Sequence, residues 1–293
     1  MDDKRLISIG LDEVQFQIQA EHDFGWLRKV GKVFRVFDHQ DSGCLSFGIQ
    51  SDRGRLFLKY AGARPINYRG EPSHAVAELK QAVARYEVLH HPNLVELLDH
   101  FPIADGYAAV FGWFDGVVLN SPDYPAPRKY TDPVSPYYQF RRLSLARRLD
   151  CLDHIFDFHE HVEQRCYVAV DLYDGSVLYD FEHHITKICD IDCYRPRPFF
   201  NHMGRLWGSS RFMSPEEFTL GAEIDQRTNV FNLGAMAFCL VGGDRDRSYT
   251  KWEAGDALFQ IALRAITPER DRRFSSVAEF QREWSRTRRQ AGL

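Results

Sequence analysis

Apolar and polar residues alternate along three short runs early in the chain, over residues 32–37, 45–50 and 55–60. A period of two is typical of a strand with one buried face, so each run is predicted to be a strand. Because the links between the runs are short, the three strands favour an antiparallel sheet. Residues 1–27 show no clear period, and we expect them to be an extension packed on this part of the chain.

Helical spacing of apolar residues follows the three predicted strands. It predicts a helix over residues 73–90, with Pro92 just beyond its end. An apolar run over residues 107–114 then indicates a buried strand that leads into the turn Asp115-Gly116.

The middle of the chain is predicted to be irregular before it becomes helical again. Residues 119–140 contain five prolines and show no helical or strand period, so we expect a long ordered loop there. A second helix is predicted from about Arg141 to about Gln164, since its apolar positions recur at helical spacing.

Two acidic residues flank a predicted hairpin within residues 167–192. Asp171 precedes its first strand, Asp190 follows its second, and an Asp174-Gly175 turn lies close to the start. Two carboxylates held at one end of a hairpin are costly unless a cation or an exchangeable proton occupies the space between them. Phosphoryl transfer uses such a pair: one carboxylate orients the acceptor hydroxyl and takes its proton, and the other holds magnesium on the nucleotide phosphates.

Composition limits the possible classes of protein. The 293 residues are 44% hydrophobic and 14% aromatic, which suits one large domain or two small lobes with a substantial core. A net charge of -4 with mixed signs gives no general attraction to nucleic acid or anionic membrane. The six cysteines lack Cys-x-x-Cys spacing, and no run approaches ~20 apolar residues, so we expect a cytoplasmic protein with reduced thiols and no membrane or nucleic-acid partner.

The acidic hairpin resembles two functional loops of protein kinases. Asp171-Leu172 followed by Ser176 is similar to the catalytic loop, and Asp190-Ile191-Asp192 stands in place of the metal-binding Asp-Phe-Gly. Three later segments match the same family in order: residues 208–216 resemble the end of the activation segment, residues 229–243 the central buried helix, and residues 267–280 the closing helices.

The later segments also suggest two structural contacts. The resemblance places Arg273 where an arginine pairs with Glu216, and a partly buried ion pair between them would lock the segment. Asn229 replaces the usual aspartate but keeps an oxygen for backbone amides of the catalytic loop. The chain thus resembles bacterial eukaryotic-type Ser/Thr protein kinases with degenerate motifs.

The resemblance implies an α+β, bilobal protein-kinase-like fold. Residues 28–112 would form a small antiparallel sheet lobe with one helix, and residues 113–293 a larger, mostly helical lobe, with ATP and Mg²⁺ in the cleft. Asp171 would orient the hydroxyl, Ser209 would support the catalytic loop, and Asp190 would hold Mg²⁺ with Ser176. The residues expected to bind the nucleotide are Gly43, Phe57, Lys59, Glu78, Phe111, Gly112, Trp113, Phe114 and Asp115, with Lys59 on the phosphates and Glu78 as its candidate partner.

Several positions depart from the family pattern. Gly43 alone remains of the glycines of the phosphate-covering loop, where Asp38 and Gln40 now stand. Tyr173 replaces the catalytic-loop lysine, and Ser176 replaces an asparagine that binds magnesium. The Ser176 hydroxyl is a weaker magnesium ligand than the asparagine, and Asp174 could compensate for this.

These departures keep three functions open. The leading expectation is transfer of the ATP γ-phosphate to a hydroxyl, on Ser or Thr of a protein. A small-molecule kinase is the first alternative, because an aromatic such as Phe57 also precedes the lysine in aminoglycoside kinases. A pseudokinase that acts as a binding scaffold is the second, favoured by the eroded glycine loop, Tyr173 and Ser176.

Overall fold

The computed structural model describes residues 6–38 and 41–293. Gln40 of the expected phosphate-covering loop, and the first five residues of the expected extension, therefore lie outside the described residues. The chain forms two compact units: unit 1 comprises Met1–His90 and Val95–Phe114, and unit 2 comprises His91–Leu94 and Asp115–Leu293. The secondary structure is of the α+β type, and the sheets are small and antiparallel.

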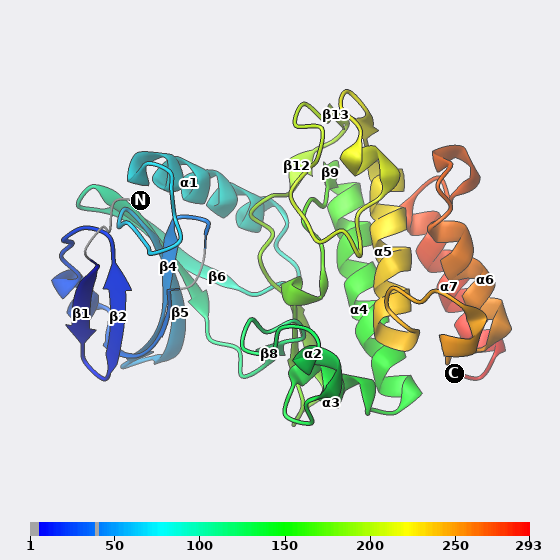
Figure 1. The fold of residues 1–293 in the computed structure, drawn as a ribbon, viewed down its shortest axis with the longest axis horizontal. Helices are drawn as coiled ribbons and strands as arrows, with labels where there is room; N and C mark the ends of the chain where they lie inside the picture. The colour runs from blue at the N-terminus through cyan, green and yellow to red at the C-terminus, as the bar shows by residue number, and fades with distance from the viewer. Residues whose placement is uncertain (1–5, 39–40) are drawn as a thin grey trace. The chain divides into compact units, whose positions relative to one another are not determined.

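Unit 1 is built on a five-stranded antiparallel sheet with the order β3-β4-β5-β7-β6 (Figure 1). Its strands are β3 (Lys32–Phe37), β4 (Cys44–Ser51), β5 (Gly54–Ala61), β6 (Leu97–Ile103) and β7 (Gly106–Gly112). The three strands predicted from alternation are confirmed as β3, β4 and β5, and the buried apolar run is confirmed as β7.

One face of this sheet is covered by the N-terminal residues. They form the hairpin β1 (Ile7–Leu11) and β2 (Val14–Ile18), followed by the 3-10 helix η1 (Gly25–Lys29). The apolar side chains that the two layers share include Leu11, Phe16, Ile18, Phe24, Leu27, Phe47, Leu58, Tyr60 and Val110. The prediction that residues 1–27 have no period is wrong for β2, because Val14, Phe16 and Ile18 alternate with glutamines along this strand.

Helix α1 (Pro72–Val88) packs against β5, β6 and β7 of the sheet. Its Tyr86 ring lies edge-on to Phe111 of β7, with 4.8 Å between ring centroids. The predicted helix is confirmed, and it starts at the proline that presets the helical φ angle of the first turn.

The core of unit 2 is a set of packed helices. They are α4 (Leu145–Gln164), α5 (Gln226–Val241), α6 (Gly255–Ala265) and α7 (Val277–Gln290). Helices α4 and α5 run side by side (Figure 1), and α5 is buried at every position from Thr228 to Val241. The predicted end of α4 at Gln164 is confirmed, but the helix begins at Leu145, because the Ser144 hydroxyl accepts the N–H of Arg147 and caps it there.

The proline-rich segment is more regular than predicted. It contains α2 (Arg128–Thr131) and α3 (Pro136–Arg141), so the expectation of a loop without helices is wrong. Helices of one or two turns are too short to show a recurrent apolar stripe, which is why the pattern missed them.

Short strands complete unit 2. The predicted acidic hairpin is confirmed as β10 (Val177–Asp180) and β11 (Ile185–Ile188), and β8 (Val117–Val118) extends its sheet. The remaining strand pairs are β9 (Tyr167–Val168) with β12 (Arg195–Pro196), and β13 (Phe199–Phe200) with β14 (Glu223–Ile224). The 3-10 helices are η2 (Asp174–Ser176), η3 (Pro215–Phe218), η4 (Tyr249–Lys251) and η5 (Arg270–Arg272). Within the described ranges, no helix is both long and apolar enough to span a bilayer.

Candidate active site

The hairpin holds Asp171 and Asp190 on either side of Ser176. The Ser176 hydroxyl donates to the backbone oxygen of Asp171 at 3.4 Å. The backbone oxygen of Ser176 accepts the N–H of Cys189 at 2.9 Å, and Cys189 immediately precedes Asp190. The backbones of both acids therefore lie close to Ser176. This agrees with the prediction that the two acids are found at one end of the hairpin.

Both acids have a left-handed backbone conformation. The φ angle is +65° at Asp171 and +58° at Asp190. Residues other than glycine are uncommon in this region, and such strain costs of order 1–3 kcal/mol when the surrounding structure imposes it. The surrounding structure holds the backbone of both acids in this region, as it does at five other described residues: Asp12, Ala104, Cys166, His184 and Asp244.

The charges of the two carboxylates act on the same two tyrosines. Burial, followed by the charges of Asp190 and Asp171, raises the pKa of Tyr173 far above its usual range. Burial and the same two charges raise the pKa of Tyr194 as well. Both phenols therefore stay protonated even well above neutral pH, mainly because they are buried.

Tyr194 is supported by a buried histidine of α4. The Ile155 carbonyl can only accept a hydrogen bond, so His159 Nδ1 donates to it at 2.7 Å, and Nε2 accepts from the Tyr194 hydroxyl at 2.8 Å. Burial lowers the pKa of His159 to about 4, which keeps the imidazole neutral. The sequence predicts a helix through this residue but contains no signal for its partner Tyr194, so the polar role of His159 was missed.

Asp174 is an ionic anchor of the segment that follows Asp171. Its side chain is fully buried, and Arg211 donates to it at 2.6 Å and 3.1 Å. Lys129 of α2 forms a second ion pair with the same carboxylate, and Arg211 also pairs with Asp244 at 2.9 Å. Because two buried cations already engage the Asp174 oxygens, the expectation that Asp174 compensates as a metal ligand is wrong.

The segment at residues 208–216 approaches the first acid. A side-chain carbon added at Gly208, where φ is +140°, would lie 3.6 Å from the Cα atom of Asp171. The neighbouring Ser209 is half-buried, and its backbone oxygen accepts the N–H groups of Phe212 and Met213 at 2.9 Å and 3.3 Å. Support of the catalytic loop by the Ser209 side chain stays a prediction.

Two contacts expected from the later segments are confirmed. Arg273 Nη1 donates to Glu216 Oε1 at 2.6 Å and Nη2 donates to Oε2 at 3.0 Å, with both side chains almost completely buried. Asn229 of α5 binds Ala169, two residues before Asp171, through the Ala169 N–H and carbonyl. These contacts tie the 208–216 segment and the residues before Asp171 to the helical core of unit 2.

Unit 1 presents three of the candidate nucleotide residues on one face of its sheet. Lys59 pairs in register with Ala109 of β7, and Phe57 pairs with Phe111. Residues directly opposite each other, or two apart on a strand, point to the same face. The Phe57 and Phe111 rings lie 6.2 Å apart, and Lys59 is buried beside them. This face therefore carries one ammonium group next to aromatic surface.

Gly43 and Glu78 have other contacts within unit 1. A side-chain carbon at Gly43 would come within 2.7 Å of Ala75 and 2.8 Å of the Tyr68 ring, so this position requires glycine for close packing. Glu78 is half-exposed, and its Oε1 lies 3.7 Å from His74 Nε2. Their expected roles toward a nucleotide stay predictions.

Gly112 and Trp113, two of the residues expected to bind the nucleotide, use their backbone N–H groups within unit 1. The Gly112 N–H donates to Glu96 at 3.0 Å, and the Trp113 N–H donates to Arg55 at 3.3 Å. Phe114 is the last residue of unit 1, and Asp115 is exposed at the start of this part of unit 2. The expected contribution of residues 112–114 must therefore come from carbonyl oxygens or from the Phe114 N–H.

The donor atoms around the hairpin suit magnesium. Asp190 supplies a carboxylate and Ser176 a hydroxyl, and Mg²⁺ commonly binds one or two protein oxygens together with phosphate oxygens and water. Across residues 6–38 and 41–293, no three His, Cys, Asp or Glu side chains gather closely enough to hold a metal by themselves. Asp190 and Ser176 could therefore hold Mg²⁺ only together with oxygens supplied by a ligand or by water.

Comparison with known proteins adds no assignment to this geometry. No protein-family model matches the chain, and no curated protein sequence matches it.

Proposed function

We propose that the chain has a bilobal protein-kinase-like fold, with unit 1 as the small lobe and unit 2 as the large lobe. Its proposed activity is transfer of the γ-phosphate of ATP to a hydroxyl group, on Ser or Thr of a protein. The observation that carries the proposal is the pair Asp171 and Asp190, held at one end of a hairpin in the same left-handed conformation and acting on the same two tyrosines.

The proposed roles follow from the chemistry of each side chain. Asp171 orients the acceptor hydroxyl and takes its proton as the new bond to phosphorus forms. Asp190 and Ser176 are the magnesium ligands; when bound, Mg²⁺ supplies charge neutralisation on the phosphate oxygens. Lys59 contributes a further positive charge to the phosphates, and Ser209 steadies the loop that carries Asp171.

Positioning is the main contribution of the protein to such a reaction. Asp174 supports it through Arg211 and Lys129, and the contacts of Asn229 and Tyr194 hold the backbone on either side of the acids. These contacts hold the backbone that carries both acids before substrate binds, so little backbone reorganisation is needed during the reaction.

A scaffold without catalytic activity is the second candidate. It is favoured by Tyr173, a protonated phenol at the position where protein kinases carry a lysine. The two cations next to the loop, Lys129 and Arg211, are paired with Asp174 and Asp244, so they do not simply replace the missing charge.

Nucleotide binding and phosphate transfer separate these functions. The melting temperature of the purified protein is measured with and without Mg-ATP, and transfer from radiolabelled ATP is then measured with dephosphorylated casein and with an aminoglycoside as acceptors. Stabilisation by Mg-ATP together with labelled casein supports the proposal. Labelling of the aminoglycoside alone supports a small-molecule kinase, and stabilisation without transfer to any acceptor supports the scaffold.

A further inference from the structure

A small pocket in unit 2 is lined by the short helices α2 and α3 and by the turn that follows α5. Its volume is about 290 Å³, close to the lower limit of the range of roughly 300–1,000 Å³ for small-molecule sites. None of its residues belongs to the candidate catalytic, magnesium or nucleotide residues. The residues that line the pocket are Tyr130, Tyr137, Tyr138, Arg141, Arg142, Gly242, Gly243 and Asp244.

Two of the three tyrosines form a fixed aromatic wall. The rings of Tyr130 and Tyr137 meet edge-on, with 5.4 Å between their centroids, and 41% of the surface of Tyr130 is exposed. Both hydroxyl groups are already engaged: Tyr130 donates to Asp244 at 2.9 Å, and Tyr137 donates to the Cys239 carbonyl at 2.8 Å. What Tyr130 offers to a ligand is therefore apolar ring surface in a defined position.

Arg142 is an exposed cation at the edge of the pocket. Its guanidinium carbon lies 5.0 Å from the centre of the Tyr138 ring, and its Nη2 donates to the Tyr138 hydroxyl at 3.0 Å. Within the part of the chain that the structure describes, Arg142 forms no ion pair, and the Tyr138 hydroxyl donates its own proton to no protein group. The remaining guanidinium N–H groups and the phenolic O–H can therefore donate to an anion.

Arg141 is held in place by groups behind the pocket. Its Nη1 donates to the Leu240 carbonyl at 2.5 Å, and its Nη2 pairs with Glu253. Arg148 donates to the other oxygen of the same carboxylate at 2.5 Å. Two arginines thus share one glutamate, so this group of three residues carries one net positive charge. The fixed position of Arg141 reduces the entropy that ligand binding would cost.

Positive charge exceeds negative charge around the pocket. The charged residues that line it, taken with their ion-pair partners, are five cations and three carboxylates: Lys129, Arg141, Arg142, Arg148 and Arg211 against Asp174, Asp244 and Glu253. This leaves two positive charges in excess, which a doubly charged anion would balance. A phosphate monoester carries about -1.5 to -2 at neutral pH, and its oxygens match the planar fork of an arginine.

We propose that this pocket binds an aryl phosphate, a phosphate monoester on a single aromatic ring. The phosphate accepts hydrogen bonds from Arg142 and from the Tyr138 hydroxyl, and the ring packs on Tyr130. The small volume suits one ring with its phosphate. This site goes beyond the proposed phosphotransfer function, because the two share no residue and binding here requires neither magnesium nor ATP.

Calorimetric titration of the full chain with phenyl phosphate tests this site. The buffer contains no magnesium, and its pH lies above about 6, the second pKa of a phosphate monoester, so that the probe carries two charges. Benzoate has the same ring with one charge, and inorganic phosphate has the charge without the ring. We expect phenyl phosphate to bind at least about tenfold more tightly than either, with an affinity that falls as added salt screens the arginines.

Variants locate the bound phosphate. Arg142→Ala should weaken binding of phenyl phosphate at least about tenfold, because it removes the exposed guanidinium. Tyr138→Phe keeps the ring but removes the O–H donor, so it should weaken binding to a smaller extent. Melting curves check that each variant is folded.

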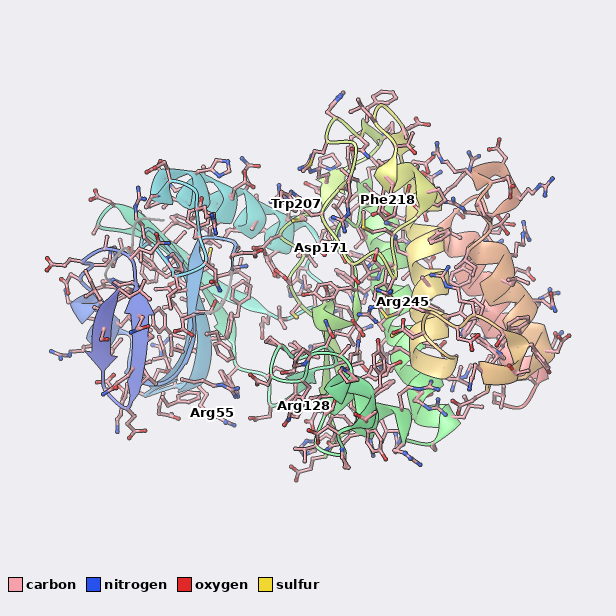
Figure 2. All side chains as sticks on the ribbon, in the orientation of Figure 1. Arg55, Arg128, Asp171, Trp207, Phe218 and Arg245 are labelled. Atoms are coloured by element: carbon pink, nitrogen blue, oxygen red, sulfur yellow. The ribbon has the colours of Figure 1, made fainter. Side chains whose placement is uncertain are left out.

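Two exposed arginines outside the pocket lining serve as matched controls, and Figure 2 labels both. Arg128 lies 5.2 Å from the centre of the Tyr124 ring and so repeats the arrangement of Arg142 on Tyr138. Arg245 directly follows Asp244 and is exposed. Arg128→Ala and Arg245→Ala should bind phenyl phosphate as wild type does.

The same aryl phosphate occurs in free compounds and in the phosphotyrosine side chains of proteins. An alanine pentapeptide with phosphotyrosine at its centre is therefore titrated next to phenyl phosphate. Tighter binding of phenyl phosphate assigns the pocket to a free compound, and tighter binding of the peptide assigns it to a phosphotyrosine protein. Either result supports the aryl-phosphate site, and binding of neither probe overturns it.

The outcomes separate this inference from the proposed function. Binding that depends on Arg142 but is unchanged in Lys59→Ala supports the pocket, whether or not phosphate transfer is observed. Binding that is lost in Lys59→Ala and unchanged in Arg142→Ala would place the probe at the proposed nucleotide site and overturn the pocket. Equal losses in Arg142→Ala and Arg128→Ala, or inorganic phosphate that binds as tightly as phenyl phosphate, would also overturn it.

Discussion

Asn229 binds both backbone polar groups of Ala169. Its Oδ1 accepts the Ala169 N–H at 2.9 Å, and its Nδ2 donates to the Ala169 carbonyl at 3.0 Å. An aspartate, the residue expected here from the kinase resemblance, could accept the first bond but could not donate the second. This asparagine therefore fits the local backbone better than the usual family residue does.

Restoring the family residue with Asn229→Asp should destabilise the protein. The carboxylate would face the Ala169 carbonyl without a donor, and we expect a loss of about 1–3 kcal/mol in the free energy of unfolding. Urea denaturation measures the change. Asn120→Asp makes the same chemical change at a half-buried site and serves as the control. Unchanged stability of Asn229→Asp would contradict the donor role of the amide.

The buried pair of Glu216 and Arg273 should contribute far more to stability than an exposed pair. Arg273→Ala leaves the Glu216 carboxylate buried without its main cation, so we expect a loss of about 3–5 kcal/mol. Arg227→Ala is the matched control, because its partner Asp271 is 92% exposed and such pairs contribute about 1 kcal/mol or less. Similar losses in the two variants would show that the Glu216 pair is not the lock described above.

Local patterns predicted much of this architecture from the sequence. Strands β3, β4, β5 and β7 of the unit 1 sheet, helix α1 and the acidic hairpin each show their pattern within a short window, whereas β6 shows none and was not predicted. The hairpin by itself brings the backbones of Asp171 and Asp190 together. The resemblance to kinases added the pair of Glu216 and Arg273, which lie 57 residues apart in the sequence. Periodicity alone could not have found that pair.

The polar network around Asp174 could not be predicted in the same way. Lys129 and Arg211 lie 45 and 37 residues away in the sequence, and either cation could have been an ordinary surface residue. The contact between His159 and Tyr194 depends likewise on how α4 packs against a loop 35 residues further on. Long-range ionic and hydrogen-bonded contacts follow from the tertiary structure, and sequence patterns contain no signal for their partners.

His159 should make the protein sensitive to mild acid. Burial lowers its pKa from 6.5 to about 4, so between these values the unfolded chain binds a proton that the folded protein does not. The stability that the neutral imidazole contributes is therefore fully present above pH 6.5, and it is lost as the pH falls toward 4. From pH 7.5 to 5.0 we expect His159 to account for a loss of about 2 kcal/mol.

The variant His159→Gln tests this pH dependence. Glutamine keeps a donor and an acceptor but cannot titrate, so its stability deficit relative to wild type should shrink by about 2 kcal/mol between pH 7.5 and 5.0. Urea denaturation at the two pH values gives the difference, and His202→Gln on the surface is the control. A deficit that does not change with pH would contradict the buried neutral imidazole.

Asp174 and Asp190 should respond differently to substitution. Asp174→Asn leaves Lys129 and Arg211 buried next to a neutral amide, so it should lower the melting temperature by several degrees without changing the Mg²⁺ concentration that gives half-maximal transfer. Asp190→Asn removes the proposed magnesium ligand and should raise that concentration. An increased Mg²⁺ requirement in Asp174→Asn would contradict its role as an ionic anchor.

A second substitution separates charge from packing at Asp174. Adding Lys129→Met to Asp174→Asn removes one of the two cations left without a carboxylate, and it should recover part of the lost stability. Thermal unfolding of the two single variants and the double variant gives this coupling. Additive losses would show that the charges of Lys129 and Asp174 do not interact.

The most direct test of the account is phosphate transfer by Asp171→Asn. With radiolabelled ATP, Mg²⁺ and the acceptor that wild type uses best, we expect the rate to fall by a factor of about 10²–10⁴ while the thermal shift with Mg-ATP is retained, since the substitution removes a proton acceptor and leaves the magnesium ligands in place. Asp256→Asn, an exposed acid on α6, should transfer phosphate at the wild-type rate. Transfer by Asp171→Asn at the wild-type rate would contradict the assignment of this carboxylate as the group that activates the hydroxyl.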